Sequence, residues 1–123
     1  MAILDFLKKG FNRKAYRRSA KFSVNLAPLK VKNKREWSQA EYFGAGTNIS
    51  PKGIQIETEA PLVVGDQVRL HFSLRDGSKT VEVQGITKNI RAGEDGKKVV
   101  GFEFSNPSPE VVKYLATILL LYK

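Results

Sequence analysis

The stretch "TNISPKGIQIE" at residues 47 to 57 places an amide and a hydroxyl directly before a tight turn. Ser50 at the first turn position, Pro51 at the second and Gly53 at the fourth match the preferences of a type I turn. The turn does not need Asn48, whose amide offers both an acceptor and donors beside the Ser50 hydroxyl. These groups therefore either satisfy backbone groups of the loop or read the edge of a nucleotide base.

A second group that could do chemistry is the pair Arg13 and Arg17, which Arg18 follows directly. Residues four apart point to the same side, about 13 Å apart in an extended segment and about 6 Å apart in a helix. Guanidinium is a rigid fork that binds phosphate in two places and also matches the O6 and N7 acceptors of guanine. A guanine nucleotide would suit both properties of the fork, but this pattern is common by chance in so basic a chain, and taken alone the pair is more typical of a solvated basic tail.

The composition limits the classes of protein that need to be considered. The 123 residues fit one globular domain. The net charge of +9 indicates an anionic partner. The basic residues are unevenly distributed, because residues 8 to 35 hold eleven of them and no acidic residue. With no cysteine and a single histidine, His71, the chain cannot form disulfides or a multi-histidine metal site, and no metal is expected. The apolar runs are too short to span a bilayer and the opening residues do not resemble an export signal, so we expect a cytoplasmic protein.

From Phe22 onward the apolar residues recur at every second position, which is typical of strands half buried against a core. "QVRLHFSL" is the clearest strand, and Asp-Gly at residues 76 and 77 predicts a tight hairpin to the return strand "TVEVQGI". Pro28 predicts an edge or a bulge in the first strand, and residues 37 to 46 are expected to form another strand. "RAGEDGKK" predicts a second hairpin tip. About six short antiparallel strands result, which favours a barrel or a sandwich.

The C-terminal stretch "SNPSPEVVKYLATILLLYK" changes to helical periodicity. Ser108 is a suitable N-cap, Pro109 suits the first helical position, and Glu110 lies near the positive end of the helix dipole. Five apolar residues line one face at helical spacing: Val111, Leu115, Ile118, Leu119 and Tyr122. We expect this helix to pack over an open end of the barrel, with a self-association surface as the alternative.

The two polar motifs, taken in order, resemble those of the PilZ domain family. "RKAYR" at residues 13 to 17 is similar to its R-x-x-x-R motif, and "NISPKG" at residues 48 to 53 is similar to its D/N-x-S-x-x-G motif. The resemblance implies a mainly β fold, a six-stranded antiparallel β-barrel with a C-terminal α-helix and a flexible basic N-terminal segment. The expected organisation is a tail (1–12) and a PilZ-like domain (13–123), made of a ligand-clamping segment (13–21), a barrel (22–105) and a helix (108–122).

The resemblance also implies a ligand, the bacterial second messenger cyclic di-GMP, and no other cofactor. Carried over residue by residue, Arg13 and Arg17 would hold phosphates and guanine Hoogsteen edges, while Asn48 and Ser50 would hydrogen-bond a guanine. Asn48 is the allowed alternative to Asp at its position. Gly53 would let the ligand approach the backbone.

The residues on either side of the first motif bear on stoichiometry. Arg18 adds either a phosphate contact or only charge, and Asn12 stands where some family members carry another arginine. The resemblance therefore leaves open whether one or two cyclic di-GMP molecules bind each chain.

The expected function is a cyclic di-GMP receptor that changes conformation on binding and signals to a protein partner, with motility, surface polysaccharide or secretion as family-level outputs. We expect a monomer or a weak homodimer. An enzyme is not expected, because His71 stands on an outward strand face without a nucleophile or acid partner. Two alternatives stay open: a basic barrel that binds nucleic acid by stacking bases on Trp37, Tyr42 or Phe43, and a PilZ-like interaction module that binds no nucleotide.

Overall fold

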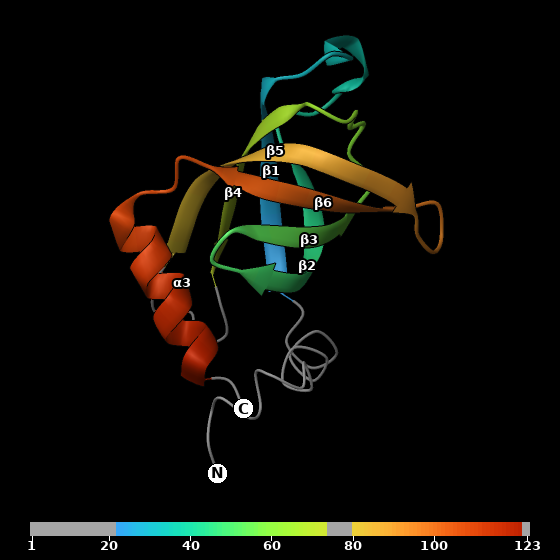
Figure 1. Cartoon of the computed structure of the whole chain (residues 1–123). Helices are drawn as coiled ribbons and strands as arrows, with labels where there is room; N and C mark the ends of the chain where they lie inside the picture. Colours follow the sequence, from blue (N-terminus) through green and yellow to red (C-terminus); the bar gives the residue numbers. More distant parts are fainter. Residues whose placement is uncertain (1–21, 74–79, 122–123) are drawn as a thin grey trace.

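The computed structural model describes residues 22–73 and 80–121, which form six strands, one 3₁₀ helix and one α-helix (Figure 1). The elements are β1 (Phe22–Lys30), η1 (Lys34–Glu36), β2 (Tyr42–Ser50), β3 (Gly53–Thr58), β4 (Gln67–Ser73), β5 (Thr80–Ala92), β6 (Lys98–Ser105) and α3 (Pro109–Leu121). All neighbouring strands pair antiparallel in the order β1-β2-β3-β6-β5-β4, and the barrel closes because β4 also pairs with β1. The six-stranded antiparallel barrel predicted from the sequence is confirmed.

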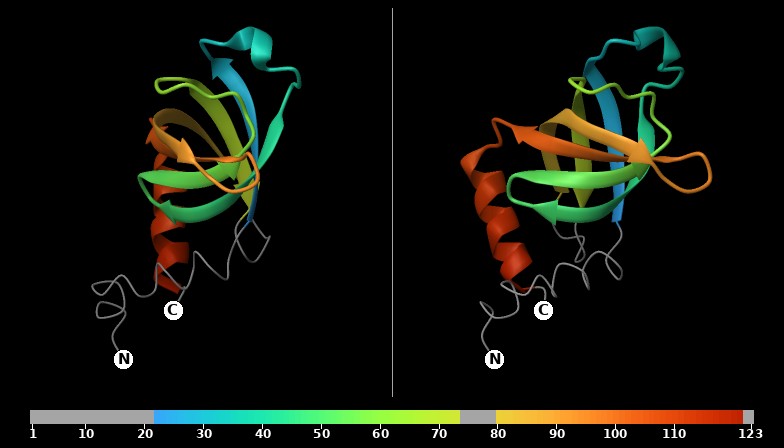
Figure 2. Two further views of the ribbon diagram at one scale, coloured as in Figure 1. Left: turned by 90° about the vertical axis from the view of Figure 1, so that its right-hand side faces the viewer. Right: turned by 45° about the vertical axis from the view of Figure 1, so that its right-hand side comes forward.

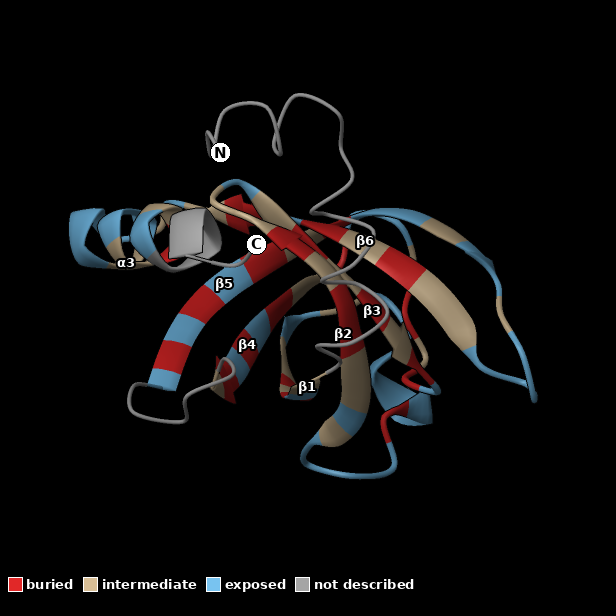
Figure 3. Cartoon of the chain, turned by 90° about the horizontal axis from the view of Figure 1, so that it is seen from below, coloured by how far each residue is buried: buried red, intermediate tan, exposed pale blue. Residues whose placement is uncertain are grey.

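The core fills the inside of the barrel, as the period-two pattern predicts. On β4, Val68, Leu70 and Phe72 are buried, whereas Arg69 and His71 are exposed. Figure 3 shows the same alternation as bands of buried and exposed residues along β4 and β5. The second hairpin tip is also confirmed, because β5 and β6 are joined by a short turn that projects beyond the barrel (Figure 2). The Asp-Gly hairpin at residues 76 and 77 lies outside the described residues.

Two irregularities shape the first half of the barrel. The register between β1 and β4 shifts between Pro28 and Lys30, which confirms the bulge predicted from Pro28. The strand expected at residues 37 to 46 was placed too early, because β2 begins only at Tyr42. Trp37 instead packs its ring edge-on against the ring of Tyr42, with a centroid distance of 5.2 Å, and the loop between them closes through a 3.0 Å hydrogen bond between the hydroxyls of Ser38 and Tyr42.

A buried carboxylate organises the turn before β4. Asp66 is only 1% exposed, and its side chain accepts hydrogen bonds from the backbone N–H groups of Lys32 at 3.0 Å and Val63 at 2.9 Å. Gly65 next to it has φ of +98°, a conformation that favours glycine. Asp66 therefore connects the chain after β1 to the turn that starts β4.

The C-terminal helix begins as predicted, since Val111 donates its backbone N–H to Ser108 Oγ at 3.2 Å. Leu115 is fully buried, and Val111 and Tyr114 pack against the core, so α3 is anchored on the barrel beside β2 (Figure 1). The side chains at positions 118–122 of the predicted apolar face lie outside the described part of the structure. Among the described residues, no helix has the length and apolar character needed to cross a bilayer.

Candidate functional site

The second motif lies on the β2–β3 hairpin, where a β-bulge decides which side chains face outward. Pairing passes from Gly46 opposite Ile56 to Asn48 opposite Gln55, which leaves Thr47 as an extra residue on β2. If the alternation continued unbroken from the exposed Phe43, Asn48 would point into the barrel. The extra residue reverses the alternation, so that Asn48 and Ser50 lie on the outer side while Ile49 is buried. The sequence analysis placed Asn48 and Ser50 in a loop, and this was wrong, because both residues belong to strand β2.

The turn that follows uses the Ser50 hydroxyl as an acceptor. Ser50 pairs with Gly53 across a two-residue connection, and its Oγ accepts the backbone N–H groups of Lys52 at 3.2 Å and Gly53 at 3.3 Å. The carbonyl of Lys52 in turn accepts the N–H of Phe104 at 2.8 Å, which fixes the turn against β6. Since a hydroxyl has two acceptor lone pairs, Ser50 can offer a ligand only its O–H donor.

The amide of Asn48 is the least satisfied polar group of the motif. Its Oδ1 is buried and has no hydrogen-bond partner among the residues that the structure describes. An unsatisfied buried acceptor costs about 1–3 kcal/mol. One role considered for Asn48 from the sequence was to hydrogen-bond backbone groups of the loop. The contacts of its Oδ1 among the described residues do not support that role.

Gly53 has a packing role of its own. A Cβ built on Gly53 would collide with the backbone carbonyl oxygen of Phe102, and the φ of Gly53 does not lie in the left-handed region. The glycine is thus required by the close approach of β3 to β6. Its predicted role in admitting a ligand to the backbone stays a prediction.

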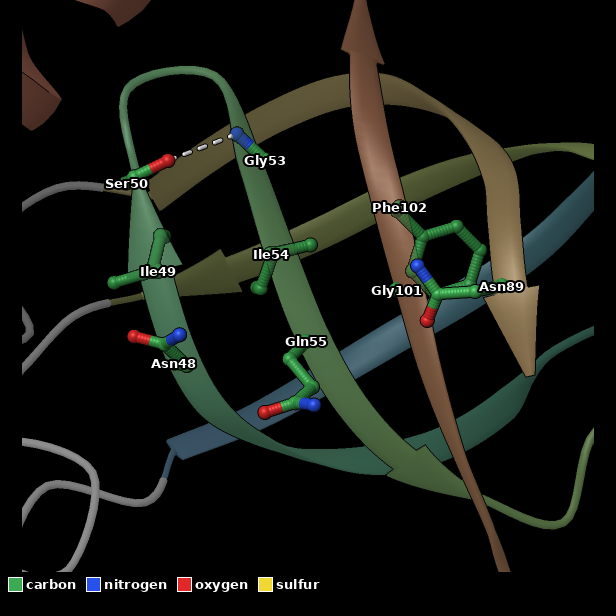
Figure 4. A pocket seen from close by; sticks show the side chains of 9 residues that line it. All are labelled: Asn48, Ile49, Ser50, Gly53, Ile54, Gln55, Asn89, Gly101 and Phe102. Atoms are coloured by element: carbon green, nitrogen blue, oxygen red, sulfur yellow. Dashed lines mark hydrogen bonds between the residues drawn. The ribbon is translucent and has the colours of Figure 1, made fainter. Parts of the chain in front are cut away.

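The motif residues border a shallow depression of about 250 Å³ on the outer face of the barrel (Figure 4). The depression is lined by Asn48, Ile49, Ser50, Gly53, Ile54, Gln55, Asn89, Gly101 and Phe102. Asn48 lies opposite Gln55, Gln55 opposite Gly101, and Gly101 opposite Asn89, so one row of residues crosses four strands. Sequence reasoning did not identify Gln55, Gly101 or Asn89, because no local pattern reveals which residues of β3, β6 and β5 lie opposite the motif.

Arg13, Arg17 and Arg18 lie outside the described residues, and the description of the chain begins at Phe22. Phe22 at the start of β1 pairs with Gly46, two residues before Asn48. Arg17 is five residues before Phe22, so their Cα atoms are at most about 18 Å apart even if the chain between them is fully extended. The length of the chain between Arg17 and Phe22 therefore permits contact between Arg17 and the Asn48 side chain.

The net positive charge of the chain is concentrated in the N-terminal residues 1 to 21, which include the three arginines. Residues 1 to 21 hold seven of the 21 basic residues and only one of the 12 acidic residues. Near the depression the described residues contribute mainly neutral amides, and the nearby Lys88 is paired with Glu103 at 3.5 Å. Within residues 22–73 and 80–121, no group of three His, Asp or Glu side chains is arranged to hold a metal ion.

Comparison with known proteins agrees with this architecture. The PilZ domain family matches residues 11–121. Two solved structures share the fold: the Bacillus subtilis inhibitor of motility MotI/DgrA, with a TM-score of 0.63 and 19% identity over 82% of this chain, and MrkH of K. pneumonia in its apo state, with a TM-score of 0.64 and 16% identity over 83% of this chain. This chain corresponds to 46% of each of those longer chains, and no curated protein matches its sequence. Since the family match covers both motifs, the barrel and the helix, the chain belongs to the PilZ domain family.

Proposed function

We propose that this protein is a receptor for cyclic di-GMP, which binds on the outer face of the β2–β3 hairpin. The observation that carries the proposal is the buried Asn48 Oδ1 without a partner among the described residues, directly beside a Ser50 hydroxyl that has only its donor left to offer. Guanine presents N–H donors on one edge and the acceptors O6 and N7 on another. A guanine base would supply the donor that Asn48 lacks and an acceptor for Ser50, and contact with the buried Oδ1 requires the atoms that cover it to move aside on binding.

The arginines of the first motif provide the positive charge that the lining of the depression lacks. In this proposal Arg13 and Arg17 bind the phosphates and the Hoogsteen edges of the guanines, and Arg18 adds a phosphate contact. Guanidinium binds phosphate through paired, charge-assisted hydrogen bonds, which are the strongest polar contacts available to such a ligand. The short tether from Arg17 to Phe22 supports this arrangement.

Ligand binding would then act as a switch. When the basic segment closes over the ligand, the outer face of the β2–β3 hairpin is covered and a new surface faces the solvent. We propose that a partner protein reads this surface, and that the output belongs to the group of motility and surface polysaccharide functions. The structural similarity to an inhibitor of motility supports an output of this kind.

Calorimetric titration of cyclic di-GMP tests the proposal. Arg13→Ala and Arg17→Ala should each weaken binding by about 1.5–3 kcal/mol, the range for a charge-assisted hydrogen bond, or about 10- to 150-fold in Kd. Arg35→Ala is the matched control, because Arg35 is an exposed arginine on η1, away from the depression. Wild-type affinity in both motif variants would contradict the assignment of the site.

The same titration separates the receptor from a nucleic-acid-binding barrel. GTP and a short oligonucleotide are titrated beside cyclic di-GMP at low and moderate salt. A guanine-specific pocket keeps its preference at moderate ionic strength, whereas oligonucleotide binding through phosphate contacts falls steeply with salt. An oligonucleotide that binds at least as tightly as cyclic di-GMP at low salt, and loses affinity steeply with salt, would favour the nucleic-acid alternative.

A further inference from the structure

We infer that Gln55 and Asn89 form a second base-binding subsite, which holds the purine of the ligand that lies away from Asn48 and Ser50. The inference rests on the proposed function and extends it to residues outside both motifs. Both side chains line the same depression as Asn48, and they follow it in one cross-strand row interrupted only by Gly101 (Figure 4).

Two β-bulges, one at each end of this row, carry the inference. The register of β5 against β6 shifts between Thr87 and Asn89, just as the register of β2 against β3 shifts between Gly46 and Asn48. Alternation from the exposed Gln84 would otherwise turn Asn89 inward, but with Lys88 as an extra residue Asn89 is exposed. Each bulge thus turns one asparagine amide outward on the same row of the barrel.

The absence of a side chain at Gly101 leaves room for the amide of Asn89 in the depression. A Cβ on Gly101 would lie 2.8 Å from Asn89 Oδ1 and 3.0 Å from Nδ2, closer than side chains normally approach. Because that side chain is missing, the amide lies over the backbone of β6. It has no hydrogen-bond partner among residues 22–73 and 80–121, so both its donor and its acceptor are available within that part of the chain.

Gln55 lies in the row between Asn48 and Gly101. Its Oε1 accepts a long hydrogen bond of 3.4 Å from the hydroxyl of the bulge residue Thr47, which leaves the amide donors of Gln55 for a ligand. Along the curved wall of the barrel, β2 and β5 are three strand spacings apart, about 14 Å. A single base covers only part of that length, whereas a ligand with two purines joined through phosphates can place one base at each end. The row therefore fits a purine dinucleotide better than a mononucleotide.

The test is titration of cyclic di-GMP into Gln55→Ala and Asn89→Ala, with Gln84→Ala as the matched control. Gln84 is also an exposed amide on β5, but it does not line the depression. We expect each of the first two variants to weaken binding about three- to tenfold, the effect of one neutral hydrogen bond, and the control to bind as the wild type does. Gly101→Ala should weaken binding similarly, because its Cβ displaces the Asn89 amide without altering that residue.

The outcomes of this test separate the inference from the proposed function. If wild-type protein binds cyclic di-GMP and Arg17→Ala weakens binding, but Gln55→Ala and Asn89→Ala both stay within twofold of the wild type, the second subsite is wrong and the receptor stands. If wild-type protein does not bind cyclic di-GMP, the receptor proposal fails, and the subsite that rests on it fails as well. Circular dichroism of each variant confirms that a loss of binding is not a loss of fold.

Discussion

Replacing Asn48 by alanine should change stability and ligand affinity in opposite directions. The substitution removes a buried oxygen that has no hydrogen-bond partner among the described residues. It also removes the group that we propose to accept a guanine N–H. A side chain kept for packing would show the reverse pattern, because its loss would lower stability and leave binding unchanged.

The magnitude follows from the environment of the amide. An unsatisfied buried acceptor costs about 1–3 kcal/mol, and its removal recovers this cost. The substitution also loses packing, at about 0.8 kcal/mol per buried methylene, which offsets a part of the gain. We therefore expect the free energy of unfolding of the ligand-free protein to rise by about 1 kcal/mol. In the complex, loss of one hydrogen bond to guanine should raise the Kd for cyclic di-GMP about tenfold.

The assay pairs urea unfolding of the ligand-free protein with calorimetric titration of cyclic di-GMP. Asn25→Ala is the matched control, because the Asn25 amide on β1 already donates to Glu41 Oε1 at 3.2 Å and does not line the depression. The control should not gain stability and should bind as the wild type does. An Asn48→Ala variant that is less stable than the wild type and binds cyclic di-GMP equally well would refute the reasoning.

Three further predictions concern the turn, the core and the N-terminal segment. Gly53→Ala should lower the free energy of unfolding by about 1–3 kcal/mol, because its Cβ collides with the backbone of Phe102, and urea unfolding beside the exposed Lys52→Ala checks this. Asp66→Ala should cost about 2 kcal/mol or more in the same assay, because two backbone N–H groups lose their acceptor. Amide exchange in residues 13–21 should slow when cyclic di-GMP binds, since this basic segment has little apolar surface to bury alone; equal exchange rates with and without ligand would contradict this.

Most of the fold was predictable because its signals are local. The alternation along β4 and the helix start at Ser108 can be read from a few consecutive residues, and both are confirmed. The start of β2 was misplaced for a physical reason. Aromatic residues at positions 37 and 42 favour a strand, but Trp37 is buried through its contact with Tyr42 across a loop, a tertiary contact that the local pattern does not contain.

The candidate site was predictable only where its residues belong to a motif. Asn48, Ser50 and Gly53 lie together as the motif requires, although the structure gives Gly53 a packing reason that the sequence did not suggest. Asn89 lies 41 residues after Asn48 in the chain and enters the site through a bulge and through its pairing with Gly101. Register across a closed barrel depends on all six strands together, so no single stretch of sequence predicts it.

The central claim is that cyclic di-GMP binds on the outer face of the β2–β3 hairpin beneath the arginine segment. Titration of ¹⁵N-labelled protein with cyclic di-GMP, followed by chemical shifts, tests this directly. We predict that the largest changes occur at Asn48, including its side-chain amide, at Ser50 and Gly53, and at the signals of Arg13 and Arg17. Saturable changes that map elsewhere on the barrel, or no changes at all at millimolar ligand, would contradict the claim.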